Sequence, residues 1–296
     1  MAAGGFRRIG VAGHPRHDSI RPTIEELRRT ADEHGAEILV EDRLQEFAPD
    51  APVFDHENID LLITLGGDGT LLRGARLVAQ SGTPVLGINL GHLGFLTSMA
   101  LADLSLGLQA LFRGDFWLDV RSTLDVRVTG ADGTHGESFI AINDAVLHKG
   151  GFARVIRLAV HVGPDQHEVG TYTADGIILA TSTGSTAYSL SAGGPIVDPS
   201  MDCILATPIC PHTLVVRPLV LPMDLQVTVT PLAGVDEVIL TVDGQDGAEL
   251  RPGDHLAVRR GEPRLSLIRL AGQNFFSTLR RKLHWGLEHS DRAGSR

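Results

Sequence analysis

The residues best suited to chemistry form the segment Gly66-Gly67-Asp68-Gly69-Thr70, which follows the apolar run 59–65 and precedes a helical pattern at 71–80. Three glycines in five residues indicate a backbone that turns sharply, takes positive φ or lets another molecule approach closely. A carboxylate at the carboxyl end of a parallel strand lies where open α/β sheets usually bind ligands. Thr70 is expected to cap the helix, whose N-terminal amides favour an anion such as phosphate. The alternative is a purely structural turn in which Asp68 only caps the helix.

A second stretch of unusual composition runs over 171–198. Between Thr181 and Pro195 most residues are small, hydroxylated or glycine, and Asp175 stands beside Gly176 at the entrance. Such a segment builds little core, but it can present many amides and hydroxyls to ligand oxygens. Tyr188 could stack on a base or a nicotinamide ring, or it could fill the core. The alternative, a flexible surface linker, is disfavoured because strand-like runs bracket the segment.

The composition limits the class of protein. The chain has 296 residues, 43% of them hydrophobic, and a formal net charge of -10, which argues against a general nucleic-acid binder. Two cysteines, Cys203 and Cys210, imply neither a disulfide framework nor a zinc site, and the 13 histidines show no metal-ligand spacing. No apolar run reaches membrane-spanning length, and the N-terminus has no signal-peptide pattern. We therefore expect a cytoplasmic protein without a membrane or nucleic-acid partner.

Several common enzyme signatures are absent from the sequence. There is no G-x-x-x-x-G-K-[ST] P-loop, no H-R-D or D-F-G kinase motif, and no G-x-S-x-G elbow. No G-x-G-x-x-G opens a helix after a strand, which argues against a Rossmann dehydrogenase. These absences argue against a P-loop enzyme, a protein kinase and a serine hydrolase.

The first part of the chain alternates between strand and helix patterns. Short apolar runs predict strands at 9–12, 38–40, 59–65 and 85–88, and helical spacing predicts helices at 22–34, 71–80 and 104–111. This alternation predicts a parallel sheet with helices on its faces. The strands are continuously apolar, which agrees with burial on both sides.

After residue 115 or so the apolar period becomes two. Residues 118–128 read as one half-buried strand, Asp132-Gly133 supplies a hairpin turn, and similar runs recur at 156–162, 225–229, 238–242 and 256–258. We therefore predict an α/β domain at 1–115 and an all-β domain at 116–270. Phe276, Leu279 and Leu283 indicate a helix within 271–288, which either forms a partner surface or, as we favour, packs on the first domain. The tail, 289–296, is expected to be disordered.

Together these motifs resemble the NAD kinase family, enzymes that make NADP from NAD with ATP or polyphosphate. The resemblance covers residues 9–286 or so and rests on these motifs: Gly66–Thr70, Asn89–Phe95, Asn143-Asp144, Ala174–Gly176, Thr183–Gly194, Pro208–His212, Asp243–Gln245 and Leu279–Leu283. The first motif is shared with lipid kinases and phosphofructokinases, whereas the hydroxyl-rich segment is more specific. The resemblance implies an α/β domain followed by a β-sandwich domain that binds the dinucleotide.

The family also implies roles for single residues. Asp68 would be the general base toward the 2′-hydroxyl of the adenosine ribose, Arg73 would contact phosphate, and Asp175 would contact the nicotinamide end. The other binding residues that the resemblance implies are Gly66, Gly67, Gly69, Thr70, Asn89, Phe95, Asn143, Asp144, Arg154, Thr173, Thr183, Thr186, Ala187, Tyr188, Ser189, Leu190, Ser191, Cys210 and Gln245. Three positions depart from the usual family residue: Thr173 replaces a basic residue, Ser182 a proline and Cys210 an alanine.

The resemblance further implies Mg²⁺ or another divalent ion that comes with the nucleotide, no metal held by the protein alone, and a homodimer or homotetramer. Asp68 is expected to face, across the domain boundary, a cleft lined by Asp175 and residues 186–191. Two alternatives stay open at this point. One is a lipid kinase of the diacylglycerol or sphingosine type, and the other is a catalytically silent NAD(H)-sensing protein.

Overall fold

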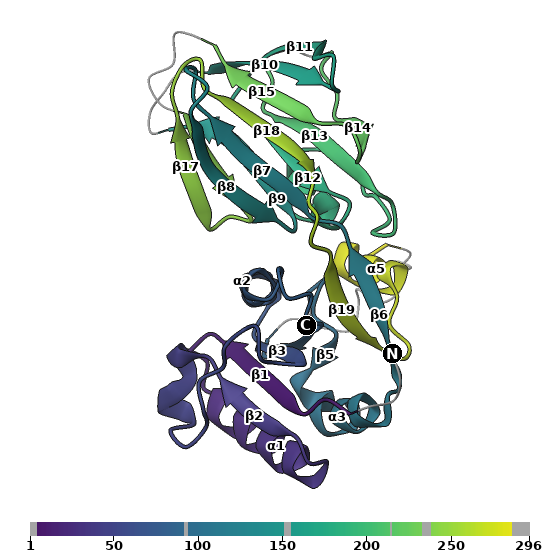
Figure 1. Ribbon diagram of the computed structural model, residues 1–296. Coiled ribbons are helices and arrows are strands. Elements are labelled where there is room, and N and C mark those ends of the chain that lie inside the picture. Colours follow the sequence, from purple (N-terminus) through teal and green to yellow (C-terminus); the bar gives the residue numbers. More distant parts are fainter. Residues whose placement is uncertain (1–4, 92–93, 151–154, 214, 233–237, 286–296) are drawn as a thin grey trace. The chain divides into compact units, whose positions relative to one another are not determined.

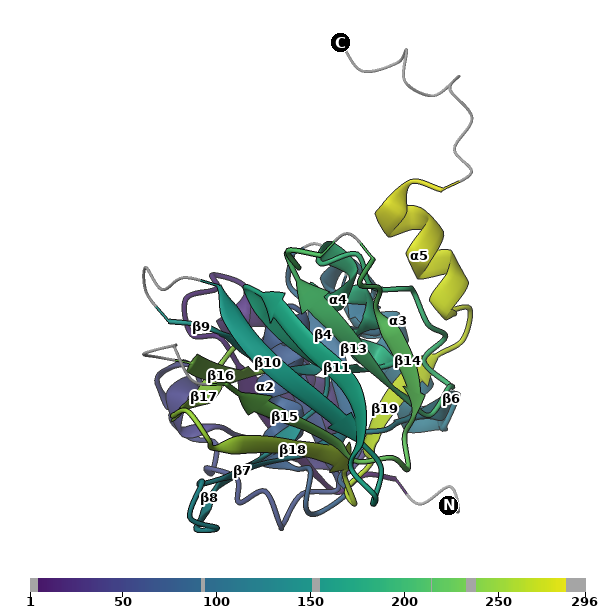
Figure 2. The same ribbon diagram turned by 90° about the horizontal axis from the view of Figure 1, so that it is seen from above.

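The computed structural model describes residues 5–91, 94–150, 155–213, 215–232 and 238–285. They fall into two compact units, Met1–Asp119 with Ser266–Arg296, and Val120–Leu265 (Figures 1 and 2). The domain ranges given by the sequence, 1–115 and 116–270, stay a prediction.

The first unit is built on a mixed sheet with the strand order β2-β1-β3-β4-β19-β6, in which β5 also pairs with β4 (Figure 1). The pairs that join β1, β2, β3 and β4 are all parallel. The strands are β1 (Arg8–Gly13), β2 (Glu37–Val40), β3 (Leu61–Leu65), β4 (Val85–Asn89), β5 (Met99–Ala100), β6 (Phe116–Arg121) and β19 (Leu265–Leu270). The helices are α1 (Ile20–Glu33), α2 (Asp68–Leu77), α3 (Leu104–Arg113) and α5 (Phe275–Leu283), with 3-10 turns η1 (Asp42–Phe47) and η2 (Leu101–Asp103).

The core of this unit confirms the predicted α/β arrangement. Strands β3 and β4 are buried along their whole length, as continuously apolar strands require. Ile24 and Leu27 of α1 and Leu108 of α3 pack in the same apolar cluster as the strands. The carboxyl ends of β1, β3 and β4 therefore share one edge of the sheet, which is where a ligand is expected.

Helix α2 begins three residues earlier than the sequence pattern suggested. Its N-cap is Gly67, without a side-chain cap, so the expectation that Thr70 caps the helix is wrong. The reason is the conformation of Gly66, whose φ is 154°. A Cβ at Gly66 would overlap the Thr70 side chain, which lies directly against this glycine. Thr70 instead fills the inside of the turn, and Asp68 becomes the first helical residue.

Thr64, in β3, supplies a stability prediction. Its side chain is fully buried and its hydroxyl has no hydrogen-bond partner among the described residues, which is costly in a protein interior. Thr64→Val keeps the shape and removes this hydroxyl, so we expect the free energy of unfolding to stay level or rise by about 1 kcal/mol. The matched control is Thr181→Val, at an equally buried threonine whose hydroxyl donates to the Ile142 carbonyl at 2.7 Å. That control should lose about 1–3 kcal/mol in denaturant titrations; equal losses in both variants would contradict the prediction.

The second unit is a sandwich of two six-stranded sheets, ordered β11-β10-β15-β18-β7-β8 and β14-β13-β12-β9-β16-β17 (Figure 2). The described strand pairs of these sheets are antiparallel. The first sheet comprises β7 (Leu124–Thr129), β8 (His135–Ala141), β10 (Ile156–Val162), β11 (His167–Ala174), β15 (Val227–Pro231) and β18 (His255–Arg260). The second comprises β9 (Asp144–Lys149), β12 (Gly176–Thr181), β13 (Cys203–Ile209), β14 (Leu219–Pro222), β16 (Val238–Val242) and β17 (Asp246–Leu250); η3 (Thr183–Thr186) and α4 (Tyr188–Ser191) follow β12.

The alternating sequence pattern is what builds this sandwich. Val126 of β7 and Leu158 of β10 point into the same buried cluster as Leu147 of β9 and Leu179 of β12, so the core lies between the two sheets. This confirms the predicted all-β region and the β-sandwich that the family implied.

The single strand predicted at 118–128 is wrong. It is two strands, β6 in the sheet of the first unit and β7 in the sandwich, separated at Ser122-Thr123. Thr123 donates from Oγ1 to the Pro263 carbonyl at 2.5 Å. Because the break is two residues long, the apolar residues stay at even positions on both sides of it. Periodicity alone could not reveal the break.

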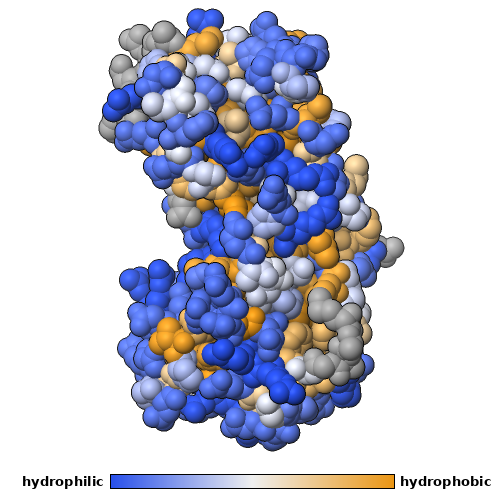
Figure 3. All heavy atoms as spheres, in the orientation of Figure 1, coloured by the Kyte–Doolittle hydropathy of each residue, from blue (hydrophilic) through white to orange (hydrophobic). Residues whose placement is uncertain are grey.

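The C-terminal helix α5 belongs to the first unit, as expected. Its N-cap is Asn274, which accepts from the Ser277 amide at 2.8 Å, and Leu279 is buried. Gln273, just before the helix, donates from Nε2 to the Ser98 carbonyl. The tail at 289–296, expected to be disordered, lies outside the described residues. None of the described helices is long and apolar enough to cross a membrane, and the face in Figure 3 is mostly hydrophilic.

Candidate active site

Asp68 lies at the carboxyl end of β3, and three backbone amides hold its carboxylate. Phe95 N donates to Oδ2 at 2.7 Å, and Leu96 N and Thr97 N donate to Oδ1 at 3.1 and 3.2 Å. A carboxylate offers about four lone-pair positions. With three of them used by amides, one position remains for a hydroxyl donor. Asp68 is therefore fixed in orientation and still able to accept a proton.

The loop that carries these amides has its own supports. Asn89, at the end of β4, accepts from Gly91 N at 2.7 Å and donates to Thr97 Oγ1 at 3.3 Å. From β19, Arg269 donates to the Leu96 carbonyl at 2.8 Å and to the Phe95 carbonyl at 3.4 Å, while its Nε pairs with Asp119 at 3.0 Å. The buried Arg269 thus fixes the loop from behind, and sequence reasoning missed it. Asn89 and Phe95, predicted as ligand contacts, here support Asp68.

Gly94 leads to a prediction about activity. A Cβ at this position would overlap the Asp68 carboxylate, so Gly94→Ala must displace either the loop or Asp68. Asp68 is predicted to take part in catalysis, so we expect kcat to fall by at least tenfold, because misplacement of a catalytic group by about 1 Å is sufficient for such a loss. The matched control is Gly91→Ala in the same loop, where a Cβ meets only an ordinary contact at 3.9 Å. Initial-rate measurements would show equal losses in the two variants if the contact with Asp68 were irrelevant.

Arg73, one helical turn after Asp68, makes a bidentate ion pair with Glu41. Its NH2 atom lies 2.7 Å from Glu41 Oε2 and donates to the Gly13 carbonyl at 3.1 Å. Both side chains are largely buried, and the pair connects α2 to the ends of β1 and β2. The phosphate contact expected of Arg73 stays a prediction, and it would require exchange of the Glu41 partner.

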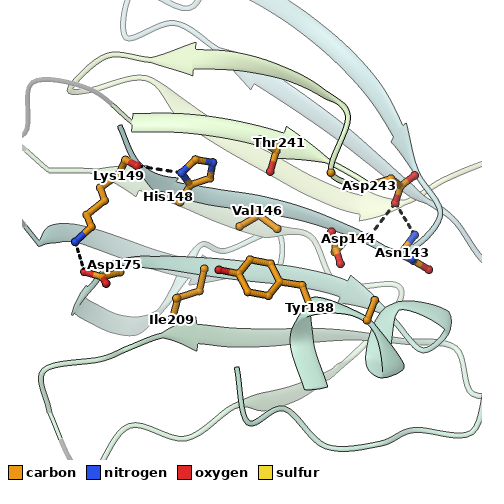
Figure 4. A pocket seen from close by; sticks show the side chains of 12 residues that line it. Asn143, Asp144, Val146, His148, Lys149, Asp175, Tyr188, Ile209, Thr241 and Asp243 are labelled. Atoms are coloured by element: carbon orange, nitrogen blue, oxygen red, sulfur yellow. Dashed lines mark hydrogen bonds and ion pairs between the residues drawn. The ribbon is translucent and has the colours of Figure 1, made fainter. Parts of the chain in front are cut away.

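In the second unit, a pocket of about 540 Å³ lies on the outer face of the sheet that contains β9 and β12. Figure 4 shows Lys149 and Asp175 at one end and Asn143, Asp144 and Asp243 at the other. Val146, Ile209 and the Tyr188 ring lie between the two ends. A pocket with polar groups at both ends and apolar walls between them suits an elongated ligand that carries rings.

Tyr188 is 47% exposed, so it is not a core residue, and its ring is available to the pocket. It stands at the start of α4, directly after η3. An exposed tyrosine ring can stack on an aromatic ligand. This position agrees with the interpretation that Tyr188 stacks on a base or a nicotinamide ring.

Asp243 organises the other end of the pocket. Its carboxylate accepts from three consecutive amides, with Oδ1 2.7 Å from Asn143 N and 3.1 Å from Asp144 N, and Oδ2 3.1 Å from Ile142 N. Asp144 is 5% exposed beside it. Burial, and then the charge of Asp243, raises the pKa of the Asp144 carboxyl from 3.8 to about 7. This end of the pocket therefore holds a carboxyl that titrates near neutral pH.

The hydroxyl-rich segment is neither a surface linker nor a row of free donors. Thr181, Ser182, Ser185 and Ser189 are almost fully buried. Ser182 donates to the Pro199 carbonyl, Ser185 to the Val197 carbonyl, and Ser189 shares a hydrogen bond with Thr207. Most of the expected hydroxyl donors thus form hydrogen bonds inside the fold. These hydrogen bonds stabilise a tight turn that carries Ala187 and Tyr188.

Gly184 shows how closely this turn packs. A Cβ at Gly184 would overlap the Asn143 backbone, so only glycine allows η3 to lie against the start of β9. Thr181 N donates to the Asn143 carbonyl at 2.9 Å. The turn and the Asn143-Asp144 segment therefore form one structural unit.

Only some of the binding residues predicted in the second unit line its pocket. Those that do are Asn143, Asp144, Asp175, Ala187 and Tyr188. Residues that do not line it are Thr173, Thr183, Thr186, Ser189, Leu190, Ser191, Cys210 and Gln245. Thr183 instead accepts from buried Arg121 at 3.1 Å, and Cys210 is exposed with φ of 44°. Arg154 lies outside the described residues.

Sequence reasoning missed seven residues of the pocket: Val146, His148, Lys149, Ile209, Thr241, Asp243 and Gly244. Ile209, Asp243 and Gly244 lie in motifs of the family resemblance but had no predicted role. The strand period also places Val146 and His148 on the same face as Asp144. No signal indicated Lys149, which follows at the strand end. The cleft predicted between Asp68 and Asp175 stays a prediction.

The chain belongs to a class of two-unit proteins in which a glycine-aspartate turn on an α/β unit accompanies a pocket on a β-sandwich unit. The ATP-NAD kinase N-terminal domain family matches residues 9–116, and the ATP-NAD kinase C-terminal domain family matches residues 142–270. The chain is 45% identical over 280 residues to an NAD kinase of Gemmatimonas aurantiaca, covering 94% of this chain and 96% of the relative. It is 43% identical over 290 residues to an NAD kinase of Moorella thermoacetica, covering 97% and 92%.

Solved structures agree with this relationship. Yeast NADH kinase complexed with NADH matches with a TM-score of 0.88 and 28% identity, over 96% of this chain and 89% of that chain. An NAD kinase from Archaeoglobus fulgidus matches in fold, with a TM-score of 0.73 and 24% identity, over 94% and 98%. The chain belongs to the NAD kinase family. The predicted function, phosphotransfer to an alcohol group of NAD, is confirmed, and the lipid kinase and silent-sensor alternatives are not favoured.

Proposed function

We propose that this chain transfers a phosphoryl group from ATP to the 2′-hydroxyl of the adenosine ribose of NAD, with Asp68 as the general base. The observation that carries the proposal is the fixed Asp68 carboxylate, bound by three amides at the carboxyl end of β3. ATP as donor is supported by the ATP-NAD kinase family match. Polyphosphate as an alternative donor stays a prediction.

The proposed reaction does not require a strong base. An aspartate with a usual pKa of about 3.9 cannot hold a sugar hydroxyl as a preformed alkoxide. Phosphoryl transfer through a loose transition state needs little charge on the attacking oxygen, so the proton can leave late. Asp68 would orient the hydroxyl through its free lone pair and accept the proton as the new P–O bond forms.

The pocket of the second unit would bind the dinucleotide. Asn143 and Asp144 offer polar groups to ribose hydroxyls at one end. At the other end, the Asp175 carboxylate lies near the exposed Tyr188 ring and the apolar Ile209 side chain (Figure 4). A carboxylate beside flat apolar surface complements a nicotinamide ring, which is cationic in NAD and carries a carboxamide donor.

A divalent ion would enter with the nucleotide. Mg²⁺ is usually bound through one or two carboxylates together with substrate phosphates, rather than by an all-protein cage. Among the described residues no group of three or more His, Cys, Asp or Glu could hold a metal ion. An ion carried by the triphosphate would neutralise phosphate charge. Mg²⁺, the homo-oligomer and the cytoplasmic location stay predictions.

The deciding experiment mixes the purified protein with NAD, ATP and Mg²⁺ and measures NADP by a coupled dehydrogenase assay. NADP should form, and formation should stop when Mg²⁺ is chelated by EDTA. Parallel reactions with polyphosphate in place of ATP test the donor, and a reaction with diacylglycerol tests the lipid kinase alternative. Absence of NADP under all donors, or phosphorylation of the lipid instead, would contradict the proposal.

A further inference from the structure

The starting observation is an ion pair inside the pocket of the second unit. Lys149 Nζ lies 2.8 Å from Asp175 Oδ1, and both side chains are about one third exposed, at 33% and 32%. Lys149 N also donates to the Asp175 carbonyl at 3.1 Å, so backbone and side chain both join the two residues. Figure 4 shows the pair at the end of the pocket opposite Asp144 and Asp243.

The chemical contrast that matters here is the charge of the nicotinamide ring. Oxidised NAD has a cationic ring and NADH a neutral one, while the carboxamide, ribose and phosphates are the same. A carboxylate without a partner would favour the cation, whereas a carboxylate paired with an ammonium presents little net charge to the ring. The charge state of this end of the pocket therefore decides how strongly the two redox forms are distinguished.

We propose that Lys149 sets the redox selectivity of the site: by neutralising Asp175 it allows NADH to be phosphorylated as well as NAD. This inference rests on the proposed function, which places the nicotinamide end at Asp175. The other two carboxylates of the pocket lie at its opposite end, so Lys149 and Asp175 set the charge at the nicotinamide end. Asp243 is engaged by three backbone amides, and Asp144 lies beside it at the far end (Figure 4).

Lys149 acts through Asp175, so it is a positioning and charge-setting residue rather than a catalytic one. It is one of two lysines in the sequence, the other being Lys282. Its removal should leave an uncompensated negative charge close to the ring. Because the pair is partly exposed, solvent screening reduces the effect, and we expect a change of about tenfold in selectivity.

The test measures kcat/KM for NAD and for NADH and compares their ratio among variants. The wild-type protein should use both forms, with kcat/KM values within about tenfold of each other. Lys149→Gln should raise the NAD-to-NADH ratio by about tenfold, and the rise should shrink in high salt. Lys149→Arg, which keeps the charge, should keep the ratio within about twofold. Lys282→Gln makes the same substitution on α5 and should leave the ratio unchanged.

The ratio separates selectivity from simple damage, because a misfolded pocket would lower both kcat/KM values together. An unchanged ratio in Lys149→Gln, an equal rise in Lys149→Arg, or a wild-type protein that rejects NADH would overturn the inference. These outcomes would leave the proposed function intact. Failure of the wild-type protein to phosphorylate either dinucleotide would instead overturn the proposed function.

Discussion

Asp68→Asn is expected to lower kcat by about 10²-fold or more while NAD binding persists. The substitution keeps the size of the side chain but removes the proton acceptor for the ribose hydroxyl. It also places an NH₂ group against one of the three amides that now donate to the carboxylate, so the loop at 94–97 should loosen slightly. The chemical step should suffer far more than the fold.

The measurement pairs steady-state turnover with NAD affinity from isothermal titration calorimetry. Asp60→Asn is the matched control, because Asp60 is an exposed carboxylate that accepts from two backbone amides, Arg7 N and Arg8 N, both at 2.9 Å. Asp60 precedes β3 and Asp68 follows it, so the two lie at opposite ends of the strand. The control should keep normal turnover. A near-normal kcat in Asp68→Asn would remove Asp68 from the role of general base.

The position of Asp68 could be predicted from the sequence, but its environment could not. A glycine-aspartate turn after a continuously apolar strand places the carboxylate at the ligand edge of a parallel sheet by local rules alone. The loop at 94–97 that binds it, and Arg269 that holds this loop, are separated from Asp68 by about 30 and 200 residues. Such contacts depend on tertiary packing, which no local pattern encodes.

The hydroxyl-rich segment illustrates a different limit of sequence reasoning. Its composition correctly indicated a special backbone, but it could not tell whether hydroxyls would face a ligand or the interior. Ser185 and Ser189 are fully buried and hydrogen-bonded within the fold. Buried hydroxyls are usually hydrogen-bonded, and here the partners, the Val197 carbonyl and the Thr207 hydroxyl, come from later segments of the chain. Fewer residues of the segment therefore line the pocket. Asp243 belongs to the motif Asp243–Gln245 but had no predicted role, and Lys149 was found only from the structure.

The free energy of unfolding is expected to fall as the pH rises from about 4 to about 7, because of Asp144. Burial, and then the charge of Asp243, raises the pKa of this carboxyl from 3.8 to about 7 in the folded protein. Between these two values the unfolded chain has already lost the proton that the folded chain still holds. Stability decreases with pH wherever the unfolded state binds fewer protons. The full cost, on the order of 4 kcal/mol, is reached above pH 7.

Asp144→Asn removes the titrating group and keeps the shape of the side chain. The variant should be nearly as stable as the wild-type protein at pH 4 and more stable by a few kcal/mol at pH 8. Urea titrations at pH 4, 5, 6, 7 and 8 would give this difference as a function of pH. Asp165→Asn is the matched control in the same unit, because the Asp165 side chain is 79% exposed in the turn between β10 and β11. Its curve should run parallel to that of the wild-type protein. A difference between Asp144→Asn and wild type that is the same at every pH would show that Asp144 ionises normally, since only a group whose pKa changes on folding can make stability depend on pH.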